Sequence, residues 1–177
     1  MFFDNNWKEK NPVVNPLSDD WFIWCPKTKN IWAWNICIKC YINMSEIMAT
    51  NLRNNIGSTD NVYNILGFLF CIRQALELCL KRLCEIKKIE IIENHKVLDI
   101  YAKIKNRYNW KKYGLIEEHL KEALKFMQEK DQIFRYPYDN KNIEYKTIAI
   151  HLSDWLYLVH ALYYVITEEQ ERNEENA

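Results

Sequence analysis

Four polar side chains in the longest helical segment of the chain could do chemistry together. Arg73, Glu77 and Lys81 follow one another at steps of four residues, and Gln74 stands next to Arg73. Side chains four apart stack along one line of an α-helix, so the carboxylate of Glu77 can pair with a cation on either side. We call these four residues the charged seam. Spacing alone favours a solvated row of helix ion pairs, worth about 0.3–0.5 kcal/mol each; the alternative is a seam that faces a specific group.

A second set of candidate residues lies toward the C-terminal end. His151 and Asp154 are three apart in a predicted helix, where the carboxylate could orient the imidazole for proton transfer. Arg135 comes sixteen residues before His151, and the end of a bundle could bring its guanidinium to the same place. The structural alternative makes His151 an exposed helix residue, with Arg135 tying its loop to a carboxylate such as Glu77. The residues by themselves favour the structural alternative.

Two further patterns are less specific. In the segment 103–112, KIKNRYNWKK, basic residues alternate with Tyr108 and Trp110, as in surfaces that bind phosphate and stack bases, but a solvated linker has the same composition and is favoured. Cys37 and Cys40 have the spacing of half a zinc site, yet no second pair completes four ligands. We therefore expect no metal and no cofactor.

The composition is that of a soluble, globular protein with one main domain. Of 177 residues, 49% are hydrophobic and 27% are charged, and 24 basic residues balance 24 acidic ones. No global positive charge attracts nucleic acid or an anionic membrane. No secretory signal and no run of about 18 apolar residues is seen. The six cysteines are then expected to be reduced thiols in a cytoplasmic protein.

Helical periodicity dominates the chain. Only three glycines and four prolines interrupt it, and long tracts lack the two-residue alternation of strands. The pattern predicts an all-α, up-and-down bundle of four to five helices, the first two antiparallel. The main helices are expected over 29–54, 58–86, 115–129 and 147–169, with a short one over 95–105.

The segment 58–86 is the predicted centre of the bundle. A cap is available from Ser58, Thr59 or Asp60. Apolar residues three or four apart then form one face, and a second rank widens it, so several neighbours should cover this helix. The first rank is Val62, Ile65, Leu69, Ile72, Leu76, Cys79 and Leu83, and the second is Leu66, Phe70 and Leu80.

Three regions are expected along the chain. Residues 1–28 contain prolines and tryptophans, a composition that predicts an extended arm. We expect the arm to pack on the bundle, and the alternative is that it packs on a partner. Residues 29–170 form the bundle, with a structured loop over 131–146. Residues 171–177 form an acidic tail that should fray.

Several short motifs resemble the core of HEPN domains. The run Gln74-Ala75-Leu76-Glu77 with Lys81 and Leu83 is similar to their QAxExxxK-type helix, and Asn94-His95-Lys96-Val97-Leu98 is similar to the His-x-Leu segment that follows it. Phe134-Arg135-Tyr136-Pro137-Tyr138-Asp139 resembles the RYP stretch before their last helix. The resemblance implies a HEPN-like bundle, with His95 capping a helix or bonding to the central one. Its binding residues would be Arg73, Gln74, Glu77, Lys81, His95 and Tyr136.

The resemblance also sets expectations for function. HEPN ribonucleases are metal-independent and carry an Arg followed after four to six residues by a His, which meet their symmetry mates in a dimer cleft. No arginine of this chain has that partner. The resemblance therefore implies a divergent, non-catalytic homodimer acting as a binding component of a bacterial defence or toxin–antitoxin system. RNA or a nucleotide, and a nucleotidyltransferase-like antitoxin, would be its partners. The alternative is a ribonuclease that uses Arg135, His151 and Asp154.

Overall fold

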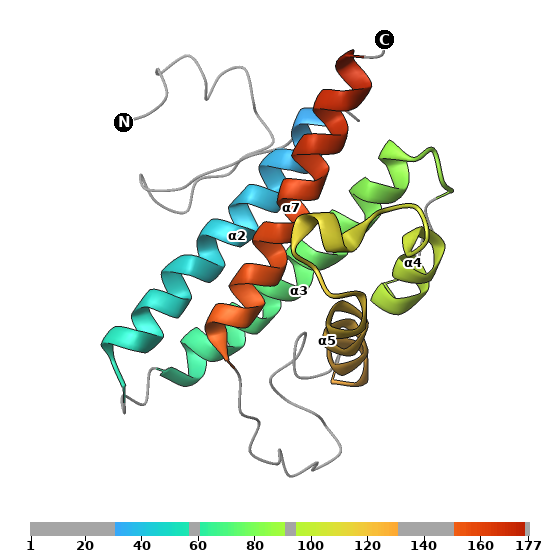
Figure 1. Ribbon diagram of the computed structural model, residues 1–177. Coiled ribbons are helices and arrows are strands. Elements are labelled where there is room, and N and C mark those ends of the chain that lie inside the picture. Colours follow the sequence, from blue (N-terminus) through green and yellow to red (C-terminus); the bar gives the residue numbers. More distant parts are fainter. Residues whose placement is uncertain (1–30, 57–60, 91–94, 131–150, 176–177) are drawn as a thin grey trace, which may run out of the picture. The chain divides into compact units, whose positions relative to one another are not determined.

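The computed structural model describes residues 31–56, 61–90, 95–130 and 151–175 (Figure 1). Within these ranges the chain forms helices and no strand, which confirms the predicted all-α bundle. The elements are α2 (Ile31–Asn54), α3 (Asn61–Ile86), α4 (Val97–Ile104), the 3-10 helix η1 (Trp110–Tyr113), α5 (Glu117–Glu129) and α7 (Leu152–Glu175). The chain divides into two compact units, Met1–Ala33 and Trp34–Ala177. The contacts below belong to the second unit, and the predicted arm, the 131–146 loop and the residues proposed to cap α3 lie outside the described ranges.

Helices α2 and α3 form an antiparallel pair, as predicted. The rings of Tyr41 and Phe70 meet edge to face with centroids 6.3 Å apart, and nearer the connection the side chain of Met48 packs against Gly67. A Cβ atom at Gly67 would lie 2.7 Å from the sulfur of Met48. The missing side chain therefore lets the two helices approach closely at this level.

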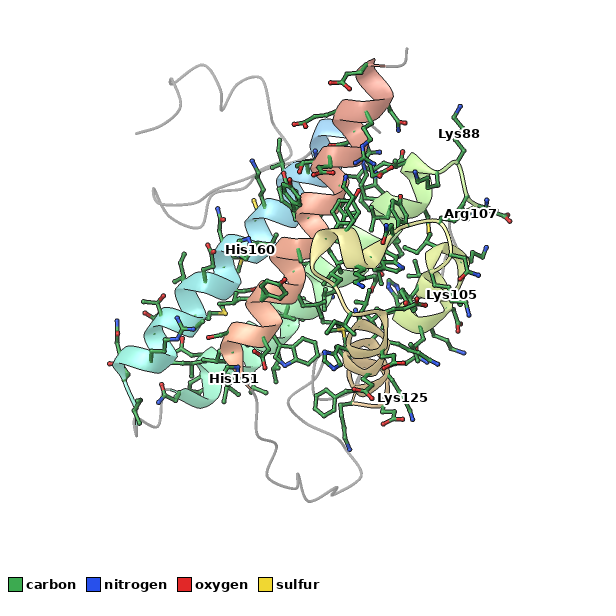
Figure 2. All side chains as sticks on the ribbon, viewed as in Figure 1. Lys88, Lys105, Arg107, Lys125, His151 and His160 are labelled. Atoms are coloured by element: carbon green, nitrogen blue, oxygen red, sulfur yellow. The ribbon has the colours of Figure 1, made fainter. Side chains whose placement is uncertain are left out.

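Helix α7 runs antiparallel along α2. Three side-chain pairs show this, because residue numbers rise on α2 as they fall on α7: Asn35 with Gln170 at 3.0 Å, Glu46 with His160 at 2.8 Å, and Arg53 with Ser153 at 2.9 Å. Figure 2 shows His160 on the side of α7 that faces α2. The Glu46–His160 and Arg53–Ser153 pairs are exposed and the Asn35–Gln170 pair is partly buried, while Ile38, Ile42 and Ala49 of α2 are buried.

Helix α3 is the centre of the bundle, packed by α7 and by α4. From Phe68 to Cys84 most of its apolar side chains are buried, as are Val159, Leu162, Val165 and Ile166 of α7. Of the predicted core residues of α3, Leu66 is half-buried, Ile65 is 37% exposed and Phe70 is 40% exposed. The hydrogen bonds that join α3 to His95 before α4 and to Tyr108 after it start from Arg73 and Leu83, both further along the helix than Ile65 and Phe70. This helix also has the length and composition of a membrane span, Tyr63–Ile86, a pattern that a central, buried helix shares.

The short helices α4 and α5 pack through apolar residues three or four apart. Val97, Tyr101 and Ile104 of α4 are buried, and so are Leu120, Leu124 and Met127 of α5. Lys96 gives α4 no side-chain cap, and the amide of Leu98 donates instead to Oε1 of Gln128 at 3.1 Å. Helix α5 thereby holds the start of α4 in place.

Both ends of the last helix differ from the prediction. Helix α7 begins at Leu152, so His151 stands just before it, and α7 continues to Glu175 instead of fraying after residue 170. Ion pairs account for the extension. Arg172 bonds to Glu168 and Glu169, each at 2.9 Å, and Lys87 reaches Glu169 from the end of α3 at 2.6 Å. Arg172 of the predicted tail is thereby bonded to the preceding turn of the same helix.

Candidate functional site

The charged seam lies on α3 and is joined through one carboxylate. Glu77 accepts from Nη1 of Arg73 through Oε2 at 2.8 Å and from Nζ of Lys81 through Oε1 at 2.7 Å. Both partners are one helical turn away, so the steps of four in the sequence translate directly into contacts. Glu77 is the point at which the two cations of the seam meet.

His95 completes this cluster from outside the helix. Its Nδ1 lies 2.7 Å from Oε1 of Glu77, and its backbone carbonyl accepts from Nη2 of Arg73 at 3.0 Å. Since an ionised carboxylate only accepts hydrogen bonds, Nδ1 of His95 must carry the proton. This is the predicted bond between His95 and the central helix. It ties the segment that leads into α4 to two residues of α3 at once.

The cluster is buried. Exposure is 1% for Arg73 and 3% for Glu77, and the side chain of Lys81 is 14% exposed, while that of His95 is 64% exposed. Burial opposes ionisation of Glu77, but the hydrogen bonds of Lys81 and His95 and the charges of Lys81 and Arg73 outweigh it. The pKa of Glu77 therefore lies below its ordinary value. Glu77 is an ionised carboxylate inside the protein, neutralised by its partners.

The interpretation of the seam as a solvated row is wrong for Arg73 and Glu77. Helix periodicity cannot distinguish a polar row that faces water from one that faces another segment of the same chain. The segment at His95 covers the row and supplies hydrogen bonds to it. Gln74, the fourth member, is half-buried on the same helix.

Of the second predicted set, the structure brings two residues together. Nδ1 of His151 lies 2.9 Å from Oδ1 of Asp154 in the first turn of α7, with side-chain exposures of 73% and 78%. Figure 2 shows His151 at the beginning of that helix. The predicted pairing of the imidazole with the carboxylate is thus present, in open solvent. Arg135 and Tyr136 lie outside the described residues.

Two neighbours of this pair were not singled out in the sequence. Arg53, at the end of α2, donates to Ser153 between His151 and Asp154. A hollow beside Asp154 is lined by His119 and Tyr157, among others, and the hydroxyl of Tyr157 donates to the carbonyl of Gly114 at 3.2 Å. Arg53 is a hundred residues from Ser153, and no local pattern links the two.

The basic segment 103–112 does not offer its rings for base stacking. Tyr108 is 8% exposed and Trp110 is 3% exposed. The hydroxyl of Tyr108 donates to the carbonyl of Leu83, and Nε1 of Trp110 donates to the carbonyl of Lys105, both at 2.7 Å. Figure 2 shows Arg107 and Lys105 pointing away from the helices. The segment is a linker whose Tyr108 and Trp110 are anchored in the core and whose basic residues are exposed, with Lys112 paired to Glu168.

A third polar cluster joins three elements. Oε1 of Glu169 accepts from the hydroxyl of Tyr113 at 3.0 Å, and Oε2 accepts from Lys87. Burial opposes ionisation of Glu169, but these hydrogen bonds and the charges of Lys87 and Arg172 hold its pKa below the ordinary value. Burial and the neighbouring Glu169 raise the pKa of Tyr113 to about 12. The cluster fastens η1 and the end of α3 to α7.

Within the described ranges, no three His, Cys, Asp or Glu side chains are grouped so as to hold a metal ion. Cys37 is half-buried and Cys40 is exposed on α2. No family model, no curated protein and no solved structure matches the chain.

Proposed function

We propose that the protein is a HEPN-like, non-catalytic helical interaction component that works as a homodimer in the cytoplasm. The observation that carries this proposal is the use of the family-like residues. Arg73, Glu77 and Lys81 are joined inside the protein, and His95 closes the cluster. Each polar group of Glu77 is engaged by the chain itself. A substrate would have to break these bonds to reach the seam.

The cluster explains why such a motif is useful without catalysis. Three positive or donating groups converge on one buried carboxylate, and two of their bonds fix the segment between α3 and α4. Removing Arg73 leaves the buried Glu77 with less compensation, and removing Glu77 leaves the buried Arg73 without its counter-charge. The motif therefore specifies how α4 is placed on α3, and with it the outer surface that partners meet.

The biological system in which this component acts is proposed on the HEPN resemblance alone. We propose a bacterial defence or toxin–antitoxin system, with a nucleotidyltransferase-like antitoxin as the protein partner and RNA or a nucleotide as the ligand. The test is co-expression of the chain with a nucleotidyltransferase-like protein encoded next to it. We expect the two to co-purify as one complex of defined stoichiometry. Separate elution of the two proteins at micromolar concentration would contradict the proposed partner.

A ribonuclease is the second candidate, and one observation favours it. His151 is paired with Asp154 in open solvent, and His119 lines the hollow beside that same aspartate. RNA cleavage by the 2′-hydroxyl needs a base that takes the proton of that hydroxyl and an acid that protonates the leaving 5′-oxygen, roles that two histidines can fill, with an arginine such as Arg135 or Arg53 stabilising the charge on the phosphate.

The two candidates are separated by incubating purified protein with labelled RNA, with and without EDTA, beside H151A, H119A and R135A. The interaction component leaves the RNA intact in all four proteins. Cleavage that persists in EDTA and is lost in H151A establishes the ribonuclease instead. H160A is the matched control, since His160 also pairs with a carboxylate at the surface, that of Glu46.

A further inference from the structure

The outward face of α2 carries an apolar stripe that the bundle does not cover. Ile36 is 38% exposed, Met44 is 44% exposed and Ile47 is 61% exposed, and Cys40 is exposed between them. These residues and Asn43 recur three or four apart, so they form one line along the helix. We call these five residues the outer stripe. The opposite side of α2 is the one buried in the core, through Ile38, Ile42, Ser45 and Ala49.

We infer that the outer stripe binds the outer stripe of a second copy of this chain, with the two α2 helices antiparallel. This inference rests on the proposed homodimer and names the surface that forms it. Two features of α2 support a second copy as the occupant: the shape of the stripe and the charges beside it.

The shape is that of a coiled-coil surface. A shallow hollow on α2 is lined by Asn43, Glu46, Ile47 and Thr50, with Asn51 at its edge. The first four are spaced i, i+3, i+4 and i+7, the four residues that form a hole for a side chain of a facing helix. Cys40 and Ile36 lie about one and two turns before Asn43 and have the spacing of the corresponding knobs. The same helix therefore supplies both halves of the contact.

The charges are self-complementary in the antiparallel arrangement. When Ile36 faces Ile47 of the second copy, Cys40 faces Asn43 of the second copy, and Lys39 comes beside Glu46 of the second copy. Lys39 and Glu46 are both exposed. On their own subunit they lie on the α7 side of the stripe, where the ammonium of Lys39 is 5.7 Å from the ring centre of Tyr163 and Glu46 pairs with His160.

The contact should be reversible. From Ile36 to Ile47 the stripe spans about three helical turns, so the interface falls at the small end of the range for proteins, below about 1,200 Å². Asn43 places a polar group inside the apolar line, a device that fixes register at some cost in affinity. We expect a dimer that dissociates on dilution.

The test measures the dimer dissociation constant of the full chain by sedimentation equilibrium. I47E puts a charge into the interface twice per dimer, and we expect it to weaken association at least about thirtyfold. I116E is the matched control, because Ile116 is 57% exposed just before α5, and it should leave the dissociation constant unchanged. Circular dichroism of both variants checks that the fold is intact.

A charge exchange tests the antiparallel register. K39E and E46K should each weaken the dimer, by about threefold to tenfold, and the double variant K39E/E46K should restore it. A dimer that I47E leaves intact, or single charge variants that the exchange does not rescue, would overturn the outer stripe while leaving a homodimer in place. A wild-type chain that is monomeric at every concentration would overturn both the outer stripe as an interface and the homodimer itself. If Cys40 of that monomer is protected from maleimide, another part of the same chain covers the stripe.

Discussion

Two histidine–carboxylate pairs in this protein have almost the same geometry and opposite surroundings. His95 and Glu77 are 2.7 Å apart, and His151 and Asp154 are 2.9 Å apart. The carboxylate of Glu77 is 4% exposed and shared with Arg73 and Lys81, whereas that of Asp154 is 78% exposed. The first pair joins two segments distant in sequence, and the second lies within one helical turn.

The comparison shows that a contact distance does not decide what a pair is for. Inside the protein, a carboxylate needs its partners to remain ionised, and each partner it loses is costly. At the surface, water replaces a lost partner at little cost. The Glu77 cluster is therefore used for stability, while the His151 pair is available to a ligand.

The largest effect is expected from R73A, which leaves Glu77 with one cation fewer and the carbonyl of His95 without this donor. Breaking a buried ion pair from one side costs about 3–5 kcal/mol, so the free energy of unfolding should fall by about that amount in urea titrations. R107A is the control, because Arg107 is exposed and its removal should change little. Equal stability of the two variants would mean that the cluster does not hold the fold.

Acid should weaken the protein through Glu77 and Glu169, the two buried carboxylates in the part of the chain that the structure describes. The pKa values of Glu77 and Glu169 are lowered in the folded protein. Their contribution to stability is therefore present above the unfolded pKa, about 4.3 for a glutamate, and is lost as the pH falls through the folded pKa. Urea midpoints measured from neutral pH downward should drop over that window. E77Q should flatten the dependence, and a curve parallel to that of the wild type would exclude Glu77 as a source.

A smaller effect is expected from H95A. The imidazole is 64% exposed, so solvent screens its bond to Glu77, and Arg73 and Lys81 remain. The loss should be about 0.5 kcal/mol or less, because the carbonyl of residue 95 still accepts from Arg73. If H95A lost as much unfolding free energy as R73A, the imidazole of His95 would be the main stabilising member of the cluster.

Much of the fold could be predicted from the sequence because local periodicity determines it. Apolar residues three or four apart located the described α-helices, though not η1, and most of the buried side of α3. The short connection after Asn54 indicated the antiparallel pair. The failures have a common physical cause. Exposure of Phe70, burial of Arg73 and the extension of α7 beyond residue 170 all depend on what lies across from a helix.

The candidate site was harder to predict from the sequence, because its surroundings also depend on segments distant in the chain. The order Arg73, Glu77, Lys81 is visible in one helix, but its burial depends on the His95 segment, eighteen residues beyond Glu77. The bond of Arg53 to Ser153 and the place of His119 beside Asp154 arise only when distant helices come together. Local spacing thus found the groups and could not assign their surroundings.

The comparison of the two pairs is tested most directly by measuring the unfolding free energy of E77Q and D154N at neutral pH. Both substitutions remove one charge and keep the shape of the side chain. We expect E77Q to lose about 3 kcal/mol, because Arg73 stays buried without its counter-charge, and D154N to be indistinguishable from the wild type. Similar values for the two variants would contradict the claim that the charged seam belongs to the structural core.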